Sequence, residues 1–265
     1  MAKIISIHSF RGGTGKSNLT ANLAATLAAQ GKRVGVIDTD IQSPGIHVLF
    51  GLDEARLPRS LNDYLWGTCR IEEAAYDMSE QLGAQRAAGG ALFLIPSSIR
   101  AGEIARVLRE GYDVGRLNDG FGELIRQLRL EHLLIDTHPG LNEETLLSMT
   151  ISDLLLLVLR PDRQDFQGTA VAVEVARKLE VPNMYLVVNK APPAYDAVAV
   201  RGQVESAYKV PVAAYIHQCD EMLQLGSSAL FCLRYPNHPY TQQVGEIAAH
   251  ITGVNGSGDL PRARS

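Results

Sequence analysis

The stretch SFRGGTGKSN, residues 9–18, follows a short apolar run and precedes a helical pattern. Glycine-rich turns between a strand and a helix bring successive backbone N–H groups together at the positive end of the helix, which favours phosphate binding. The pattern G-x-x-x-x-G-K-[ST] normally begins with a glycine, but Phe10 stands in that position and Arg11 precedes the glycine pair. The sequence therefore predicts a phosphate-binding loop of unusual form, with a cation at its entrance.

The residues of this loop have distinct expected roles. Lys16 is expected to contact the β- and γ-phosphates of a nucleotide, and Ser17 to ligate Mg²⁺. A glycine-rich turn that merely precedes a helix is the alternative, but the Lys-Ser pair in register favours a phosphate-binding loop. The nucleotide-binding residues predicted here are Gly12, Gly13, Thr14, Gly15, Lys16, Ser17 and Asn18.

Seven short apolar runs recur along the chain, each followed by a helical pattern. Because they are apolar on both faces, they predict parallel strands covered by helices on each side. The expected fold is α/β: a doubly wound, mostly parallel β-sheet flanked by helices on both faces, in the three-layer arrangement of a P-loop protein. The runs are Ile4–His8, Arg33–Ile37, Leu92–Ile95, His132–Ile135, Leu154–Leu159, Met184–Val188 and Val212–Ile216, and helices are expected at Ser17–Gln30, Phe166–Leu179 (with a cap at Asp165) and Thr241–Ile251.

Length and composition fit one large α/β domain. The chain has 265 residues, of which 46% are hydrophobic and 20% charged, so a sizeable core can form. We expect a single domain over residues 1–253 and a disordered tail, rich in Gly, Ser, Pro and Arg, over residues 254–265. Residues 53–91 are expected to form a loop-and-helix insertion.

The cysteines and the apolar segments bear on location. The N-terminal MAKIISIHSF lacks the long apolar region of a signal peptide, and no run approaches the ~20 apolar residues that span a bilayer. The chain has no C-x-x-C pair, so neither a disulfide framework nor a zinc site is expected, and a cytoplasmic location fits. The three cysteines, Cys69, Cys219 and Cys232, lie far apart in the sequence.

Carboxylates follow two of the predicted strands. Asp38 and Asp40 end the segment VGVIDTD, and Asp136 ends HLLID. Ligands of open α/β sheets bind at the carboxyl ends of the strands, so these carboxylates are expected near the phosphate loop. An alternative role for Asp38 or Asp40 is to cap a helix or a turn.

Together these segments resemble the MinD/ParA superfamily of P-loop ATPases, the SIMIBI class. RGGTGKS resembles its deviant Walker A loop, in which a cation, normally lysine, stands before the glycine pair. The D-x-D segment looks most like the MinD and Mrp branches, and DTHPG, residues 136–140, is similar to the second acidic motif of the family. The resemblance covers residues 3–253.

The resemblance implies three catalytic residues: Lys16, Asp40 and Arg11. In the family the lysine before the glycine pair reaches across a two-fold axis to the nucleotide of the partner subunit, and Arg11 stands in its place. Arginine keeps the charge, but its planar fork is bulkier, so contact with its own nucleotide or with a local carboxylate is the alternative. Asp40 is expected to position the attacking water.

The metal and base contacts follow from the same resemblance. Ser17, Asp38 and Asp136 are the expected Mg²⁺ residues, with Asp136 acting through water and sensing the γ-phosphate. Asn189, after the strand MYLVV, is expected to contact the adenine base. His138 departs from the family pattern and is expected to be an exposed loop residue, with a pH-sensitive contact as the alternative.

The implied function is a Mg²⁺-dependent ATPase, bound to ATP or ADP, that forms a homodimer with ATP and positions or regulates another assembly. Slow hydrolysis stimulated by a protein partner is expected. One alternative is a partitioning ATPase that binds DNA nonspecifically. Six arginines in residues 100–129 favour it, although the net charge of the chain is −4. The other alternative is a nucleotide sensor with negligible hydrolysis. Residues 254–265 have almost no apolar residues, so no direct membrane anchor is expected.

Overall fold

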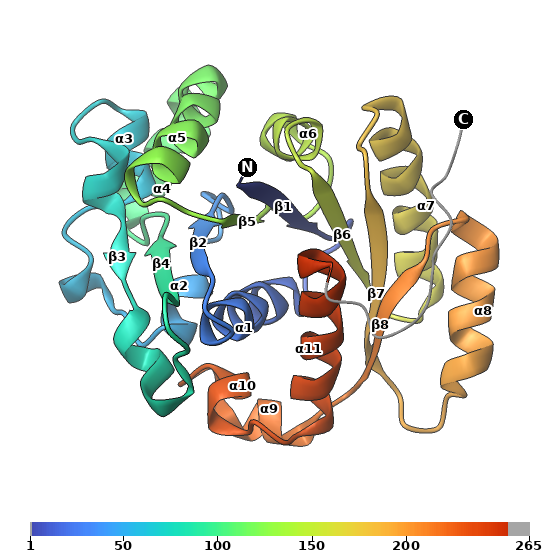
Figure 1. Ribbon diagram of the computed structural model, residues 1–265. Helices are drawn as coiled ribbons and strands as arrows, with labels where there is room; N and C mark the ends of the chain where they lie inside the picture. The colour runs from blue at the N-terminus through green and yellow to red at the C-terminus, as the bar shows by residue number, and fades with distance from the viewer. Residues whose placement is uncertain (1, 254–265) are drawn as a thin grey trace.

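The computed structural model of the chain describes residues 2–253, which contain one eight-stranded β-sheet (Figure 1). Its strand order is β3-β4-β2-β5-β1-β6-β7-β8. All pairings are parallel except that of β3 with β4, so the doubly wound, mostly parallel fold expected from the sequence is confirmed. The strands are β1 (Lys3–His8), β2 (Arg33–Asp38), β3 (Tyr76–Asp77), β4 (Ala91–Ile95), β5 (His132–Asp136), β6 (Leu154–Leu159), β7 (Met184–Ala191) and β8 (Val212–His217).

Helices cover both faces of this sheet, and Figure 1 shows α1 and α11 side by side across one of them. The apolar core of this face includes residues of α1 (Lys16–Ala29), α2 (Ile46–Leu49), η3 (Ser79–Gln85), α10 (Phe231–Arg234) and α11 (Pro239–Thr252), and the short α9 (Asp220–Leu225) packs against it. The opposite face carries α3 (Leu61–Leu65), η2 (Ile71–Ala74), α4 (Ala101–Glu110), α5 (Val114–Gln127), α6 (Glu143–Thr150), α7 (Arg163–Lys178) and α8 (Ala197–Tyr208). A further short turn, η1, spans Glu54–Arg56.

Central strands are apolar on both faces because each face meets helices. In β6 all six residues are buried, and alternate leucines enter opposite cores: Leu156 packs on the α1 side and Leu157 on the α7 side. Alternation of side chains along a strand produces this division. In α1 the buried alanines, among them Ala24 and Ala28, bring the helix close to the sheet.

Differences from the sequence-based prediction include the content of residues 53–91 and the start of α7. Residues 53–91 contain the two-residue edge strand β3 in addition to short helices, and β3 is too short for a periodicity to reveal it. Helix α7 begins at Arg163, earlier than expected, because Asp162 caps it by accepting a hydrogen bond from the N–H of Asp165. The predicted cap at Asp165 is therefore wrong, since Asp165 lies inside the first turn.

Strand register determines where the site forms. Residue Asp38 of β2 pairs with Asp136 of β5, and Asp136 pairs with Ile7 of β1 on its other side. Three strand ends and the loop that follows β1 thus meet at one edge of the sheet. No helix within residues 2–253 is long and apolar enough to cross a membrane. The tail at 254–265, expected to be disordered, lies outside the described residues.

Candidate functional site

The loop between β1 and α1 has the backbone geometry of an anion cradle. Gly13 and Gly15 have φ angles of 82° and 89°, in the left-handed region that glycine adopts without strain. A Cβ on Gly15 would lie 2.6 Å from Nδ2 of Asn189, so only glycine fits there. No hydrogen bond links an amide N–H of residues 12–15 to another described residue, which leaves these donors available to a ligand.

A cavity of about 270 Å³ opens over this loop. Its wall includes Asp40 from the loop after β2, Pro139 from the loop after β5 and Lys190 from the end of β7. The remaining lining residues are Ser9, Gly12, Gly13, Thr14, Gly15, Lys16, Ser17 and Asn18. The structure therefore places every loop residue predicted to bind nucleotide around one cavity, together with Asp40.

Two buried carboxylates and one buried lysine lie beneath the loop. Nζ of Lys16 donates to Oδ1 of Asp136 at 2.8 Å, and the hydroxyl of Thr20 donates to the same oxygen at 3.2 Å. Asp38 is fully buried, and its pKa is raised well above the usual value, first by burial and then by the charges of Asp136 and Asp40. Asp38, Asp40 and Asp136 thus gather near the ammonium group of Lys16 at this edge of the sheet.

This donor set fits a hard divalent cation. Mg²⁺ is bound by oxygen ligands, typically one or two carboxylates together with phosphate oxygens and water. Asp38 and Asp136 supply carboxylate oxygens, and Ser17 supplies a hydroxyl at the start of α1, beside Lys16. A cation bound here would favour the charged form of Asp38, which burial and the neighbouring carboxylates disfavour.

Asp40 and His138 come together across the cavity wall. Nδ1 of His138 lies 2.6 Å from Oδ1 of Asp40, and the N–H of Ser43 donates to the same oxygen at 3.1 Å. The side chain of His138 is only 25% exposed. The expectation of an exposed loop histidine is therefore wrong, since His138 contacts the carboxylate expected to position water.

Arg11 contacts residues of its own chain. Its guanidinium donates to Oε1 of Gln164 and lies 3.5 Å from Oδ1 of Asp165, both in the first turn of α7. Asp165 is almost fully buried and pairs with Arg160 through both carboxylate oxygens, whereas the Arg11 side chain is 41% exposed. A contact with a local carboxylate, which the sequence left open, is thus present in this structure.

The end of β7 holds the loop from the side opposite the carboxylates. Nδ2 of Asn189 donates to the carbonyl of Thr14 at 2.7 Å, and Nζ of Lys190 donates to the carbonyl of Gly13 at 2.8 Å. Burial, and then the charge of Arg160, lower the pKa of Lys190. Sequence reasoning missed Lys190, although the pair Asn-Lys directly after an apolar strand was a usable signal.

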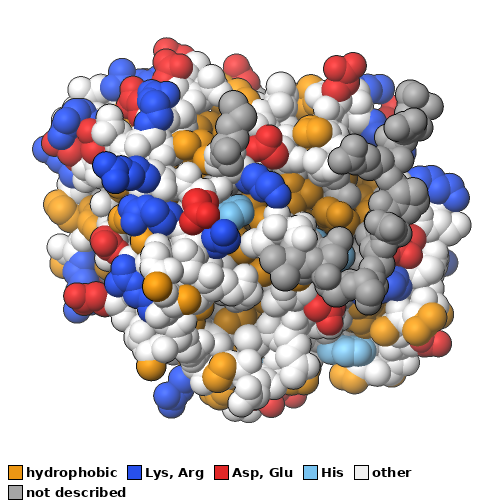
Figure 2. All heavy atoms as spheres, in the orientation of Figure 1, with side chains coloured by type: hydrophobic (Ala, Val, Ile, Leu, Met, Phe, Trp, Pro, Cys, Tyr) orange, Lys and Arg blue, Asp and Glu red, His pale blue; other side chains and the backbone are white. Residues whose placement is uncertain are grey.

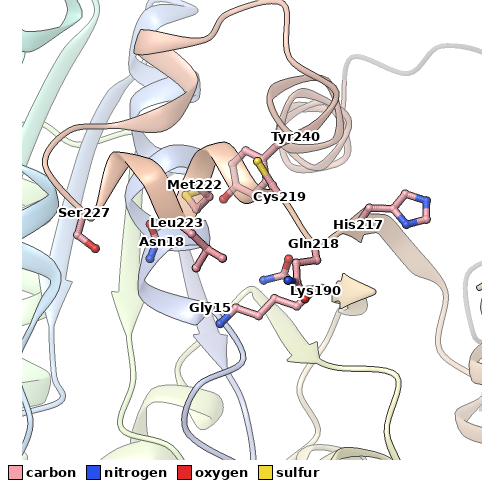
Figure 3. Close-up of a pocket in the computed structure, with 12 residues that line it drawn as sticks. Gly15, Asn18, Lys190, His217, Gln218, Cys219, Met222, Leu223, Ser227 and Tyr240 are labelled. Carbon is pink, nitrogen blue, oxygen red and sulfur yellow. The ribbon is translucent and has the colours of Figure 1, made fainter. Parts of the chain in front are cut away.

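A second cavity, of about 310 Å³, lies between α1 and α9 and adjoins the glycine loop (Figure 3). It shares Gly15, Asn18 and Lys190 with the first cavity, so both cavities adjoin the glycine loop. Figure 3 shows Met222, Leu223 and Tyr240 grouped on one side of it, while the ring of His217 points away. The wall is more apolar than that of the first cavity, as suits the flat ring of a nucleotide base.

A buried histidine behind the loop was also missed. His8, the last residue of β1, is fully buried, and burial, with a contribution from Lys16, lowers its pKa to about 3. The hydroxyl of Thr137 donates to the carbonyl of Ile7 at 3.0 Å, so it accepts from Nδ1–H of His8 at 2.9 Å. His8 is therefore a neutral residue that ties β1 to the loop after β5.

Comparison with known proteins agrees with this geometry. Residues 2–185 match the family model described as "AAA domain". An uncharacterized ATP-binding protein of Methanocaldococcus jannaschii is 26% identical over 267 residues, covering 100% of this chain and 93% of that protein. The flagellum site-determining protein YlxH of Helicobacter pylori is 27% identical over 187 residues, which cover 71% of this chain and 58% of YlxH.

The solved structures include the septum site-determining protein MinD of Pyrococcus horikoshii, complexed with Mg-ADP. Its TM-score is 0.75 at 21% identity, with 96% of this chain and 97% of that chain covered. At this identity the similarity concerns the fold. The chain therefore belongs to the AAA domain family, a P-loop family, and has the fold of the MinD and ParA proteins.

Proposed function

We propose that this chain is a Mg²⁺-dependent ATPase that forms a homodimer with ATP and, as a molecular switch in the cytoplasm, positions or regulates another cellular assembly. The observation that carries the proposal is the cluster of Lys16, Asp136 and Asp38 beneath a glycine loop with unused N–H donors. The ATP-binding name of the M. jannaschii relative and the Mg-ADP in the MinD structure support it.

Lys16 is placed to exchange partners when a nucleotide binds. Its ammonium group contacts only Asp136 among the described acidic groups. The β- and γ-phosphates would provide stronger anionic partners at the same depth of the cavity. When Lys16 turns to the phosphates, Oδ1 of Asp136 is released for a cation or its bound water.

Mg²⁺ supplies charge neutralisation between the phosphates when bound. In this chain Ser17, Asp38 and Asp136 would hold it, as the donor set fits. The backbone N–H groups of Asp40 and Gly45 donate to Asp38 at 3.0 and 3.4 Å, which keeps its carboxylate oriented. These hydrogen bonds tie the loop after β2 to the carboxylate that is proposed to bind the metal.

Asp40 is the proposed residue that positions the attacking water. It lines the phosphate cavity, and the Ser43 N–H and the His138 ring both engage Oδ1. No described residue donates to Oδ2, so this oxygen is available to accept a proton from water. His138 would hold Asp40 in a fixed orientation, and a fixed orientation lowers the entropic cost of reaction.

Arg11 is the proposed contact across the dimer. Its present partners hold it weakly, because the Arg11 side chain is 41% exposed and water competes for its guanidinium group. Asp165 keeps Arg160 after Arg11 leaves, so no buried carboxylate is abandoned. Release of Arg11 toward a phosphate of the partner's nucleotide would thus cost little. Asn189 is proposed to contact the base with its amide oxygen, since its Nδ2 already holds the loop.

The alternative of nonspecific DNA binding receives less support from the surface. Arg100 lies 3.1 Å from Glu103, Arg106 lies 2.8 Å from Glu110, and Arg116 donates to the carbonyl of Tyr64. Over α3–α5, Figure 2 shows basic side chains interspersed with acidic ones. DNA binding of this kind requires cations free to neutralise phosphates. A protein partner that stimulates hydrolysis is therefore the preferred candidate.

Phosphate release from ATP tests the proposal and separates it from the nucleotide-sensor alternative. Purified protein with Mg²⁺ and ATP should release phosphate slowly, and EDTA or Lys16→Ala should abolish the release. Lys32→Ala, a surface lysine outside the site, is the control and should leave the rate unchanged. Nucleotide binding without any phosphate release, in wild type as in Lys16→Ala, would refute hydrolysis and leave the sensor.

A further inference from the structure

Cys219, Glu221 and His238 form a cluster outside the phosphate site. Cys219 precedes α9, Glu221 lies in its first turn, and His238 caps α11. Sγ of Cys219 lies 3.4 Å from Oε2 of Glu221 and 3.9 Å from Nε2 of His238, and the latter two atoms are 3.7 Å apart. Three different donor atoms thus form a nearly regular triangle.

The size of this triangle matches one face of a zinc tetrahedron. Zinc binds sulfur at 2.3 Å and nitrogen or oxygen at 2.0–2.2 Å, so neighbouring ligand atoms lie about 3.3–3.7 Å apart. The distances between the three atoms agree to within a few tenths of an ångström. One thiolate, one imidazole and one carboxylate are a mixed set that suits Zn²⁺, whereas Mg²⁺ requires oxygen ligands.

The fourth position of such a tetrahedron can open to a cavity. All three residues line a cavity of about 580 Å³ between α8, α9 and α11. The hydroxyl of Tyr215, which also belongs to its lining residues, is buried and has no partner among the described residues. A water molecule or a small ligand can therefore complete the coordination.

We propose that Cys219, Glu221 and His238 bind one Zn²⁺ per chain, with the fourth position facing this cavity. The site was not expected from the sequence, because it contains one cysteine and not the paired cysteines of a common zinc motif. It is distinct from the Mg²⁺ residues, and it does not depend on the proposed ATPase activity.

Binding has a defined proton balance. The thiol of Cys219 loses its proton to solvent when it becomes a ligand. In the metal-free protein Nδ1 of His238 accepts from the N–H of Tyr240 at 3.1 Å, so the neutral ring carries its proton on Nε2. Ligation through Nε2 moves that proton to Nδ1 and breaks this capping bond, so zinc loosens the first turn of α11.

The zinc site and the nucleotide cavity share a wall. Cys219 and Tyr240 line both the cavity beside the glycine loop and the cavity beside the zinc site, and Figure 3 shows them next to each other. Zinc would fix Cys219 and free the amide of Tyr240. Occupancy of one site is therefore expected to alter affinity at the other.

Equilibrium dialysis of the full chain against Zn²⁺, after removal of metal with a chelator, tests the site. Wild type should bind one zinc per chain. Loss of a residue that hydrogen-bonds to a metal ligand typically weakens metal binding by roughly 10–100-fold. Cys219→Ser, Glu221→Gln and His238→Asn remove ligands themselves, so each should weaken zinc binding by at least this factor. Asparagine retains helix capping at His238, so this variant is expected to fold. Cys69→Ser, which removes another partly buried cysteine, should bind as wild type does.

Two further readouts separate this site from zinc bound elsewhere. Co²⁺ in place of zinc should give a thiolate charge-transfer band that Cys219→Ser abolishes and Cys69→Ser retains. Zinc should also accelerate hydrogen exchange at the amide of Tyr240. The proposal is overturned if Cys219→Ser and His238→Asn, folded by circular dichroism, bind zinc as tightly as wild type, or if Cys69→Ser loses the band instead.

Discussion

Nδ1 of His138 lies 2.6 Å from Oδ1 of Asp40, and this contact links the loop after β5 to the loop after β2. Both loops border the cavity of about 270 Å³ over the glycine loop, the first through Pro139 and the second through Asp40. The carboxylate expected to act on water is thus oriented by a residue of the other acidic loop. A change at one loop is expected to reach the other through this pair.

His138→Ala should therefore lower kcat for ATP hydrolysis while leaving KM nearly unchanged. A loss of about 10–100-fold is expected, because small misplacement of a catalytic group has effects of this size. Steady-state kinetics with the alanine and asparagine variants provide the measurement. Asparagine keeps a donor near Asp40 and should recover part of kcat. An alanine variant with a wild-type rate would show that the contact has no catalytic role.

Asp38→Asn should raise the melting temperature of the nucleotide-free protein. The folded-state pKa of Asp38 is raised by burial and by Asp136, so its stabilising contribution exists at low pH and is lost as pH rises through that pKa. Neutral pH is therefore unfavourable to the buried carboxyl group of Asp38, and a neutral amide removes this dependence on pH. The amide keeps an acceptor for the Asp40 N–H and loses only the longer contact with Gly45.

Asp136→Asn is the matched variant and should have the opposite effect. It leaves the buried Lys16 without its carboxylate partner, which typically costs about 3–5 kcal/mol. Thermal unfolding followed by circular dichroism compares the two. Both variants should lose the extra stabilisation that Mg²⁺ adds to ATP. Equal destabilisation by both substitutions would contradict the assigned electrostatics.

Stability should fall as pH is lowered from 6.5 toward 4, in part because of His8. The pKa of His8 is about 3 in the folded protein, against about 6.5 when unfolded, so between these values only the unfolded chain binds the proton. The expected slope from this residue is about 1.4 kcal/mol per pH unit. Urea unfolding of wild type and His8→Asn across this range measures the difference.

His217→Asn, which replaces an exposed histidine at the end of β8, is the control for that experiment. His132, whose pKa burial lowers to about 4, contributes in the same direction and remains in both variants. If His8→Asn unfolds with the wild-type dependence on pH, His8 is not neutral and buried as described.

Arg11→Ala should weaken the ATP-bound dimer, while Arg11→Lys should preserve it in part. The guanidinium is half-exposed and its partners on α7 are replaceable, so it is available to a second subunit. Sedimentation velocity over a range of concentrations with a non-hydrolysable ATP analogue gives the dissociation constant. Arg201→Ala, at an arginine on α8, is the control. An unchanged dimer in Arg11→Ala would assign Arg11 to its own chain.

The sequence predicted the fold because the central strands are buried on both faces. Continuous apolar runs such as Leu154–Leu159 identify such strands without long-range information. It also predicted which residues gather at the glycine loop, because carboxyl ends of parallel strands meet at one edge. Asp38 and Asp136 are neighbours through strand register alone. Their roles in binding and catalysis stay predictions.

Contacts between loops were beyond this reasoning. His138 and Asp40 are 98 residues apart, and nothing in the local pattern shows that the two loops touch. Lys190 donates to the carbonyl of Gly13, and its own backbone has a positive φ. Nothing in the local sequence indicates that a lysine adopts this backbone geometry. Cys219 and His238 meet only because α9 and α11 pack on the same face of the sheet.

The mass of the protein in solution, measured by light scattering with ADP and with ATP, tests the proposed switch most directly. One chain has a mass of 28.8 kDa. Asp40→Ala, expected to bind ATP without hydrolysing it, should show one chain per particle with Mg-ADP and two with Mg-ATP. If this variant binds ATP and its mass stays that of one chain at every concentration, the ATP-dependent dimer does not exist.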